Sequence, residues 1–166
     1  MSEHNFGNYD GKTPLGKNKV DCWSDKNDEA GLQDVPKDSD KPYWFDCDKC
    51  PHDFDISLND IACGKWCPYC ANQRLCNYFF CDDCYIRSFA HYKGETPLGK
   101  RKIYCWSDKR IRHNPRNILK VSDEKHWFVC DVCPCHFYNT ISNISKGSWC
   151  PYCPVPDKKS SIMQNL

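Results

Sequence analysis

The chain has 166 residues, 15 of them cysteine, and 23 Lys and Arg against 22 Asp and Glu give a formal net charge of +1. No apolar run approaches the roughly 20 residues of a membrane span, and no apolar signal-like stretch follows Met1. An odd number of cysteines, mostly in C-x2-C pairs, favours zinc over disulfides. We therefore expect a protein without membrane spans that is not secreted, in a reducing compartment (cytoplasm or nucleus) or in a virus particle.

The cysteine pattern recurs with a period of 83 residues. Residues 9–70 align with residues 92–153 without a gap, and 30 of the 62 aligned positions are identical. Such a repeat indicates two copies of one small domain, which at about 60 residues buries too little apolar surface to fold without a metal or disulfides. The expected organisation is a first, acidic unit at 1–72, a cysteine-containing linker with a short helix at 73–91, a second, basic unit at 92–155, and a flexible tail at 156–166.

Each copy is predicted to open with a turn and to continue as a short β ribbon. The phrase Thr-Pro-Leu-Gly-Lys starts at Thr13 and at Thr96, and its proline and glycine favour a turn. A short β-like run then ends at Cys22 or Cys105, and a polar loop leads to a Trp-Phe-x-Cys strand. The return strands are predicted at Asp53–Leu58 and His136–Ile141, before a glycine turn.

All six tryptophans occupy equivalent positions in the two copies, Trp23 and Trp106, Trp44 and Trp127, and Trp66 and Trp149. A small unit with few Leu, Ile and Val needs large aromatic residues to cover its metal site, so we interpret them as core. Base stacking is the alternative interpretation.

The quartets predict two closed, tetrahedral zinc sites. In each copy two C-x2-C pairs are separated by 16 residues, and four thiolates leave no open position on the metal, which is typical of structural zinc. Either unit is expected to unfold without metal. The predicted ligands are Cys47, Cys50, Cys67 and Cys70 in the first copy and Cys130, Cys133, Cys150 and Cys153 in the second.

A third zinc site is predicted in the linker, where Cys76, Cys81 and Cys84 offer three thiolates within nine residues. The candidates for the fourth ligand are His91, Cys105 and Cys63.

The linker also predicts a helix that ends at His91. If it ran unbroken from Cys84, these two residues would lie about 10 Å apart along its axis. His91 can therefore be a ligand only if the helix starts late or breaks near Ser88. We interpret His52 and His136 as residues that support the ligands or lie on the surface.

Charge distinguishes the two copies. Residues 9–72 hold 8 Lys and 13 Asp and Glu, a balance of −5, whereas residues 92–155 hold 11 Lys and Arg and 5 Asp and Glu, a balance of +6. A zinc ion with four thiolates adds −2, which makes the two values about −7 and about +4. The basic residues predicted to contact nucleic acid are Lys100, Arg101, Lys102, Lys109, Arg110, Arg112, Arg116 and Lys120.

These motifs resemble a family of zinc-ribbon, treble-clef-like tandem-repeat proteins of bacteria and of large DNA viruses of protists. The resemblance rests on Trp44–Cys70, Leu75-Cys76, Cys81–Ala90 and Trp127–Cys153. It departs at Cys135, which replaces the histidine of the first copy, and at the proline after each first knuckle. The resemblance implies a small, metal-stabilised, mostly β fold of two tandem four-cysteine zinc-ribbon units, zinc binding and, as is often presumed for the family, contact with nucleic acid.

We expect a non-enzymatic, zinc-binding module that binds nucleic acid through its basic second unit. The closed quartets and the absence of a recognisable nucleophile–base pair or phosphate loop argue against catalysis and against a small-molecule substrate. The alternative is a structural or assembly protein, for example a minor component of a large DNA virus particle. Units of opposite charge suit association with a protein partner or with a second copy of the chain.

Overall fold

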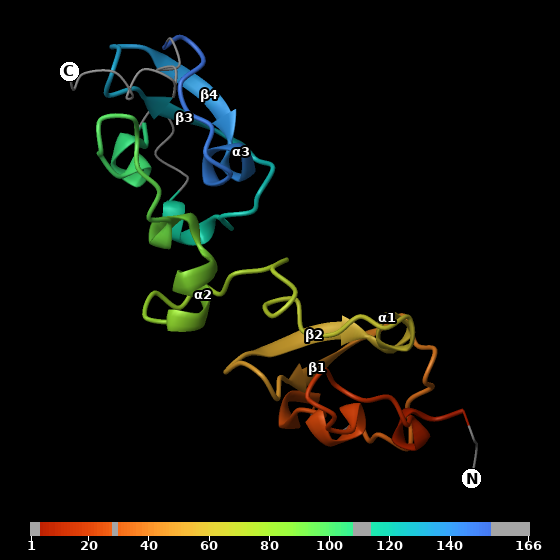
Figure 1. Ribbon diagram of the computed structural model, residues 1–166. Coiled ribbons are helices and arrows are strands. Elements are labelled where there is room, and N and C mark those ends of the chain that lie inside the picture. Colours follow the sequence, from red (N-terminus) through yellow and green to blue (C-terminus); the bar gives the residue numbers. More distant parts are fainter. Residues whose placement is uncertain (1–3, 28–29, 108–113, 154–166) are drawn as a thin grey trace, which may run out of the picture. The chain divides into compact units, whose positions relative to one another are not determined.

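The computed structural model describes residues 4–27, 30–107 and 114–153. The chain divides into two units, Met1–Cys76 and Asn77–Leu166, which are described separately below. Each unit is built around one antiparallel hairpin followed by a short helix (Figure 1). Among the described residues, no helix is both long enough and apolar enough to cross a membrane. The predicted tail at 156–166 lies outside the described residues.

In the first unit, β1 (Pro42–Asp46) pairs with β2 (Asp53–Ser57), and Phe45 lies opposite Phe54. The predicted strands are confirmed. The helix α1 (Leu58–Ala62) follows directly and was not predicted. It begins there because the Ser57 hydroxyl accepts a hydrogen bond from the Asp60 backbone N–H at 3.1 Å.

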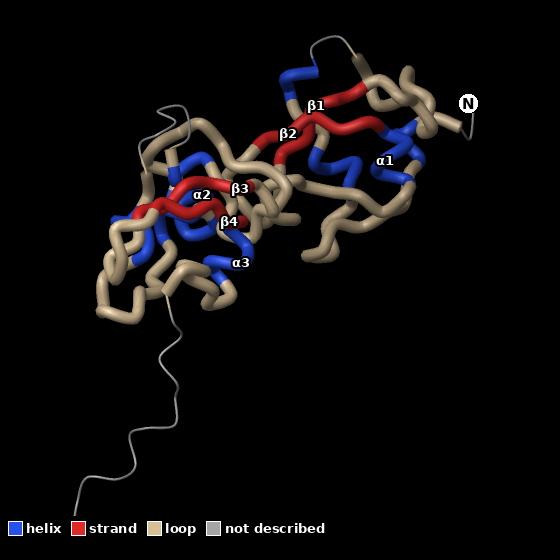
Figure 2. Tube along the Cα trace, turned by 90° about the horizontal axis from the view of Figure 1, so that it is seen from above, coloured by secondary structure: helices blue, strands red, loops and turns tan. Residues whose placement is uncertain are grey.

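The second unit repeats this arrangement with β3 (Lys125–Val129), β4 (His136–Thr140) and α3 (Ile141–Ser145). Phe128 lies opposite Phe137, and Thr140 caps α3 as Ser57 caps α1. Figure 2 shows each hairpin with its helix at the end of the second strand.

The β-like runs predicted before Cys22 and Cys105 are wrong. Both segments are single 3-10 turns, Lys19–Cys22 and Lys102–Cys105. The residue after each turn makes one isolated bridge to the hairpin, Trp23 to Phe45 and Trp106 to Phe128. Isolated bridges do not extend into strands here because the chain turns immediately before them.

Aromatic side chains form the core of each unit. Phe45 is fully buried and contacts the rings of Phe6, Trp23, Phe54 and Trp66, with centroids 5.4–6.1 Å apart. In the second unit the equivalent contacts of Phe128 are made with Phe89, Trp106, Phe137 and Trp149. These four tryptophans therefore pack in the core, as predicted. Trp44 and Trp127 alternate onto the opposite face of the hairpin.

The structural repeat begins earlier than the sequence comparison indicates. The predicted linker helix is α2 (Asp82–Arg87), which ends because Ser88 is extended. Ser88 bridges Leu119, as Asn5 bridges Pro36 in the first unit. The next residue, Phe89, is fully buried in the core of the second unit. Residues 88–91 thus pack as part of this unit.

Candidate metal centres

The hairpins bring each cysteine quartet together. The first pair follows the first strand, and the Cys47 backbone N–H closes the hairpin tip by donating to the His52 carbonyl at 3.0 Å. The second pair follows the short helix and a glycine turn, where Gly64 and Gly147 have positive φ angles of 89° and 111°. In each unit the four sulfurs lie within 4.8 Å of one another. The quartets are Cys47, Cys50, Cys67 and Cys70, and Cys130, Cys133, Cys150 and Cys153.

The spacing of the sulfurs fits one tetrahedral zinc ion. With Zn–S bonds of about 2.3 Å, the edges of a regular tetrahedron are about 3.8 Å long. The sulfur–sulfur distances are 3.7 and 3.6 Å in the first unit and 3.3, 3.5 and 3.7 Å in the second. All 15 cysteines are free thiols, so disulfides do not explain these contacts.

The pKa values of the quartet cysteines also indicate that a cation is needed to keep all four as thiolates. Burial raises the pKa of Cys67 to about 12 and raises the pKa of Cys50 as well. In the second quartet the backbone N–H of Cys135 lowers the pKa of Cys133 to about 7, whereas burial raises the pKa of Cys150. Four neighbouring thiolates therefore do not form at neutral pH unless a divalent ion stabilises their charge. The donor set, geometry and charge together fit zinc.

Backbone and side-chain donors orient the ligands. The Lys49 and Val132 N–H groups each donate to the first sulfur of their knuckle at 3.4 Å. The Thr-Pro-Leu-Gly-Lys turn is confirmed in both units, and its threonine hydroxyl donates to the aspartate inside the knuckle, Thr13 to Asp48 and Thr96 to Asp131. The turn thus holds the first knuckle in place.

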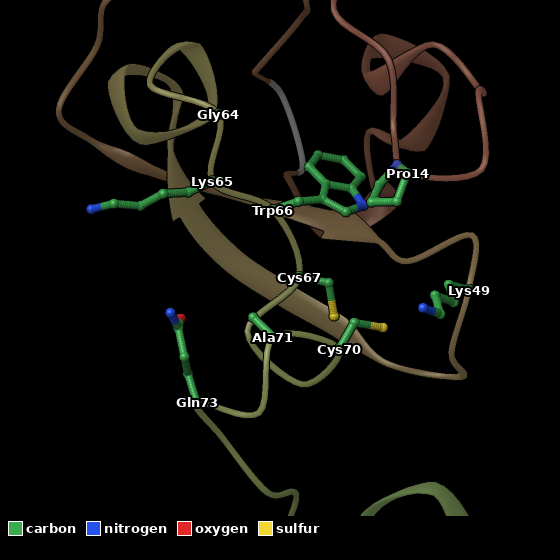
Figure 3. A pocket seen from close by; sticks show the side chains of 9 residues that line it. All are labelled: Pro14, Lys49, Gly64, Lys65, Trp66, Cys67, Cys70, Ala71 and Gln73. Atoms are coloured by element: carbon green, nitrogen blue, oxygen red, sulfur yellow. The ribbon is translucent and has the colours of Figure 1, made fainter.

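The two metal centres differ in the charge of the residues beside them. In the first unit, Cys67 and Cys70 border a pocket that Lys49 and Lys65 also line (Figure 3). The equivalent residues of the second unit are Val132 and Ser148. The acidic unit therefore carries lysines beside its thiolates, and the basic unit carries neutral residues there.

A buried lysine supports the helix of each unit, a role that its charge did not suggest. Lys102 is 3% exposed, and its ammonium donates to the carbonyls of Ile144, Gly147 and Ser148 at 3.0–3.3 Å. Burial lowers its pKa. Lys19 makes the equivalent contacts with the end of α1. A cation at this position donates to carbonyls at the C-terminal end of the helix and in the turn that follows it, where the helix dipole favours positive charge.

Replacing Lys102 by Met should destabilise the second unit by about 1–3 kcal/mol, because the carbonyls of Gly147 and Ser148 lose this buried donor. Urea unfolding of the zinc-loaded protein measures this change. Lys100→Met is the control, since Lys100 is exposed and should shift stability by less than about 0.5 kcal/mol. Equal stability of both variants would contradict the structural role of Lys102.

The eight basic residues predicted to contact nucleic acid differ in burial, and some of them lie outside the described residues. Lys102 and Arg116 are buried and donate to backbone carbonyls, so they are corrected to structural residues. Lys100 is exposed, while Arg101 and Lys120 are half-buried and each donate one hydrogen bond to a carbonyl. The remaining three, Lys109, Arg110 and Arg112, lie outside the described residues.

None of the three candidates for a fourth ligand of the linker cysteines belongs to a metal-capable group among the described residues. Among the described residues, no metal-capable group contains His91, although the helix does end before it. The His91 ring packs instead against Tyr85, with centroids 5.3 Å apart. Cys105 is a buried thiol like its counterpart Cys22, and Cys63 is exposed; neither belongs to a metal-capable group in the described part of the chain.

Comparison with known proteins agrees with this interpretation of the first quartet. A protein described as uncharacterised from Acanthamoeba polyphaga mimivirus is 31% identical over 137 residues, which make up 76% of this chain. The matched part is 30% of that protein, so the chain spans about a third of the length of this relative. Residues 20–73 match a family model described as probable Treble clef zinc finger domain. The first repeat of this chain, whose four-cysteine centre lies in the same segment, is therefore similar to a probable treble clef zinc finger.

Proposed function

We propose that the chain is a non-enzymatic, zinc-binding tandem-repeat module that binds nucleic acid through its second unit. The observation that carries the proposal is the charge difference between two units of one fold, −5 over residues 9–72 and +6 over residues 92–155. The scaffolds match, whereas only the second has a surplus of cations for phosphate groups.

The contacts of the individual Lys and Arg side chains reduce the number of residues that are available to bind phosphate. Two of the eleven positive side chains of the second unit are used internally, as shown for Lys102 and Arg116. Lys100 is exposed, and Lys120 is half-buried at a groove that Lys146 also lines. These three lysines, together with the exposed Lys93 and Lys125, are candidates for phosphate contacts among the described residues.

The proposal is tested by replacing Lys100 and Lys120 together with Glu and measuring affinity for duplex DNA and for RNA across a salt series. Each lost phosphate contact should reduce the slope of log K against log salt by about 0.9 for duplex DNA. The double variant should therefore bind more weakly, with a slope smaller by about 2.

The chain offers a matched control. Lys17 and Lys37 are exposed and stand at the equivalent positions of the first unit. Replacing this pair with Glu changes the net charge by the same amount and should leave the salt slope unchanged. If the unaltered protein does not bind nucleic acid at low salt, or if both double variants lose affinity equally, the proposal fails.

A specific observation favours a second candidate, a structural or assembly role. The acidic unit has a pocket beside its metal centre with lysines at its edge, which is a local feature that nucleic-acid binding by the other unit does not use. In this alternative the partner is a protein or a second copy of the chain. Sedimentation of the chain alone tests self-association, which should weaken with salt if the oppositely charged units attract each other.

A further inference from the structure

We propose that the outer face of the hairpin β3–β4 stacks unpaired nucleic-acid bases on Tyr138 and Trp127. All residues of this hairpin belong to the second unit. Single-stranded nucleic acid is thereby the ligand class within the proposed function, on which this inference rests. The outer face consists of the side chains that alternate with the core residues along the two strands, Lys125, Trp127, Val129, His136, Tyr138 and Thr140.

Two aromatic rings lie side by side in the middle of this face. Trp127 and Tyr138 are directly opposite each other in the antiparallel register, and their ring centroids are 5.2 Å apart with planes 34° from parallel. Tyr138 is 51% exposed. A base that stacks on Tyr138 would extend this aromatic pair by one ring. Such stacking accepts any base, because every base has a π face.

The two rings lie outside the core of the second unit. On the inner face of the same hairpin, Phe128 and Phe137 are 0% and 1% exposed and belong to the core cluster. Trp127 and Tyr138 contact each other on the opposite face, next to Val129, which is 36% exposed. A contiguous group of large apolar side chains at the surface is typical of a binding site.

The charge beside the rings suits a polyanion. Lys125 is exposed, and its ammonium lies 6.0 Å from the centroid of the Tyr138 ring. None of the six residues of the outer face is acidic. Surfaces that bind single strands combine cations along the backbone with aromatic rings under the bases. Lys125 and Tyr138 offer these two contacts next to each other.

The first unit shows that the fold does not require such a surface. In its hairpin only the central tryptophan is retained, as Trp44, and the residue opposite it is Asp55. Carboxylates at these positions repel phosphate groups. The same scaffold therefore carries an acidic face in one unit and an aromatic face with a lysine in the other. The three aspartates Asp46, Asp53 and Asp55 replace Val129, His136 and Tyr138.

Stacking on this face selects unpaired bases. Inside a duplex the faces of each base are covered by its neighbours, so aromatic side chains reach them only in single strands, loops or ends. A duplex offers this face its phosphates, from which the rings gain nothing. The quantity to be measured is therefore the effect of the bases at a constant number of phosphates.

The zinc-loaded, full-length protein is titrated with two DNA strands of equal length, oligo(dT) and an abasic strand that keeps every phosphate but has no bases. The unaltered protein should bind oligo(dT) about 5- to 150-fold more tightly, which corresponds to one stacked base. Tyr138→Thr should reduce this ratio at least about fivefold, because threonine favours a strand but has no ring. Tyr138→Phe keeps the ring and should retain the ratio.

Asp55→Thr is the matched control, because Asp55 stands at the equivalent position of the first unit. The substitution removes one negative charge, so it should change the affinity for both strands by the same factor and leave their ratio unchanged. The zinc content of every variant should equal that of the unaltered protein, which shows that both units remain folded.

Two results would overturn the stacking surface and leave the proposed function standing. The first is equal affinity of the unaltered protein for the two strands, with binding that still depends on salt and on Lys100 and Lys120. The second is a Tyr138→Thr variant with an unchanged ratio. If that variant also sediments differently from the unaltered protein, the face contacts a second copy of the chain. Failure to bind either strand at low salt would overturn both proposals together.

Discussion

Replacing Cys67 with Ser is expected to unfold the first unit and to leave the second folded. The zinc-binding free energy of a structural site is about 10–16 kcal/mol in small peptides, whereas a typical domain is stable by only about 5–15 kcal/mol. Phe45, Phe54 and Trp66 form the core of this unit, but a core this small cannot compensate for the lost metal. Heteronuclear NMR should show the amide signals of one unit collapsing to random-coil positions while those of the other persist.

Cys150→Ser is the matched variant and should reverse the outcome, because Cys150 is the equivalent ligand of the second quartet. Cys63→Ser is the control for cysteine replacement as such, since Cys63 is exposed and belongs to no metal-capable group among the described residues. Chelation of the unaltered protein should unfold both units. Native-like spectra after complete removal of zinc would contradict the structural role of the quartets.

Replacing Phe89 with Ala should destabilise the second unit by about 3–5 kcal/mol. Phe89 lies in the segment that the sequence assigns to the linker, yet its side chain is fully buried and contacts Tyr92, Trp106 and Phe128. Truncation removes these contacts and leaves a cavity. Urea unfolding with zinc present, followed by the fluorescence of the tryptophans, measures the loss.

Phe6→Ala is the counterpart in the first unit, where Phe6 occupies the equivalent buried position. It should destabilise that unit by a similar amount and leave the second unchanged. Phe80→Ala is the control, because Phe80 is 75% exposed. If Phe89→Ala behaves like Phe80→Ala, residues 88–91 are a connecting segment and not part of the folded unit.

Local sequence patterns predicted the parts of the fold that depend on nearby residues. The C-x2-C pairs, the alternation around Phe45 and the proline and glycine of each turn indicated the metal ligands, the hairpins and the turns. The short helices were missed because five residues carry little periodicity, although Ser57 and Asp60 form the cap that starts α1. In the sequence of α3, only Thr140, which is equivalent to Ser57, indicated the cap.

Charge was the least reliable guide to the candidate surface. A lysine or arginine in a sequence gives no sign of burial, because its charge is normally solvated. Lys102 and Arg116 are buried, and each donates hydrogen bonds to backbone carbonyls inside the second unit. The repeat contained a signal for the lysine, because Lys19 stands at the same position in a unit of opposite net charge.

The sequence by itself determined the two cysteine quartets, because ligand type and spacing alone specify a closed tetrahedral site. Only the tertiary structure decided which other residues serve the metal centres. In the folded structure, His52 contacts Cys50 and Lys102 donates to a carbonyl at the end of α3. Phe89 packs in a core whose other residues come later in the chain. These contacts join residues that have no common local pattern, so they follow from packing and from the need to satisfy buried polar groups.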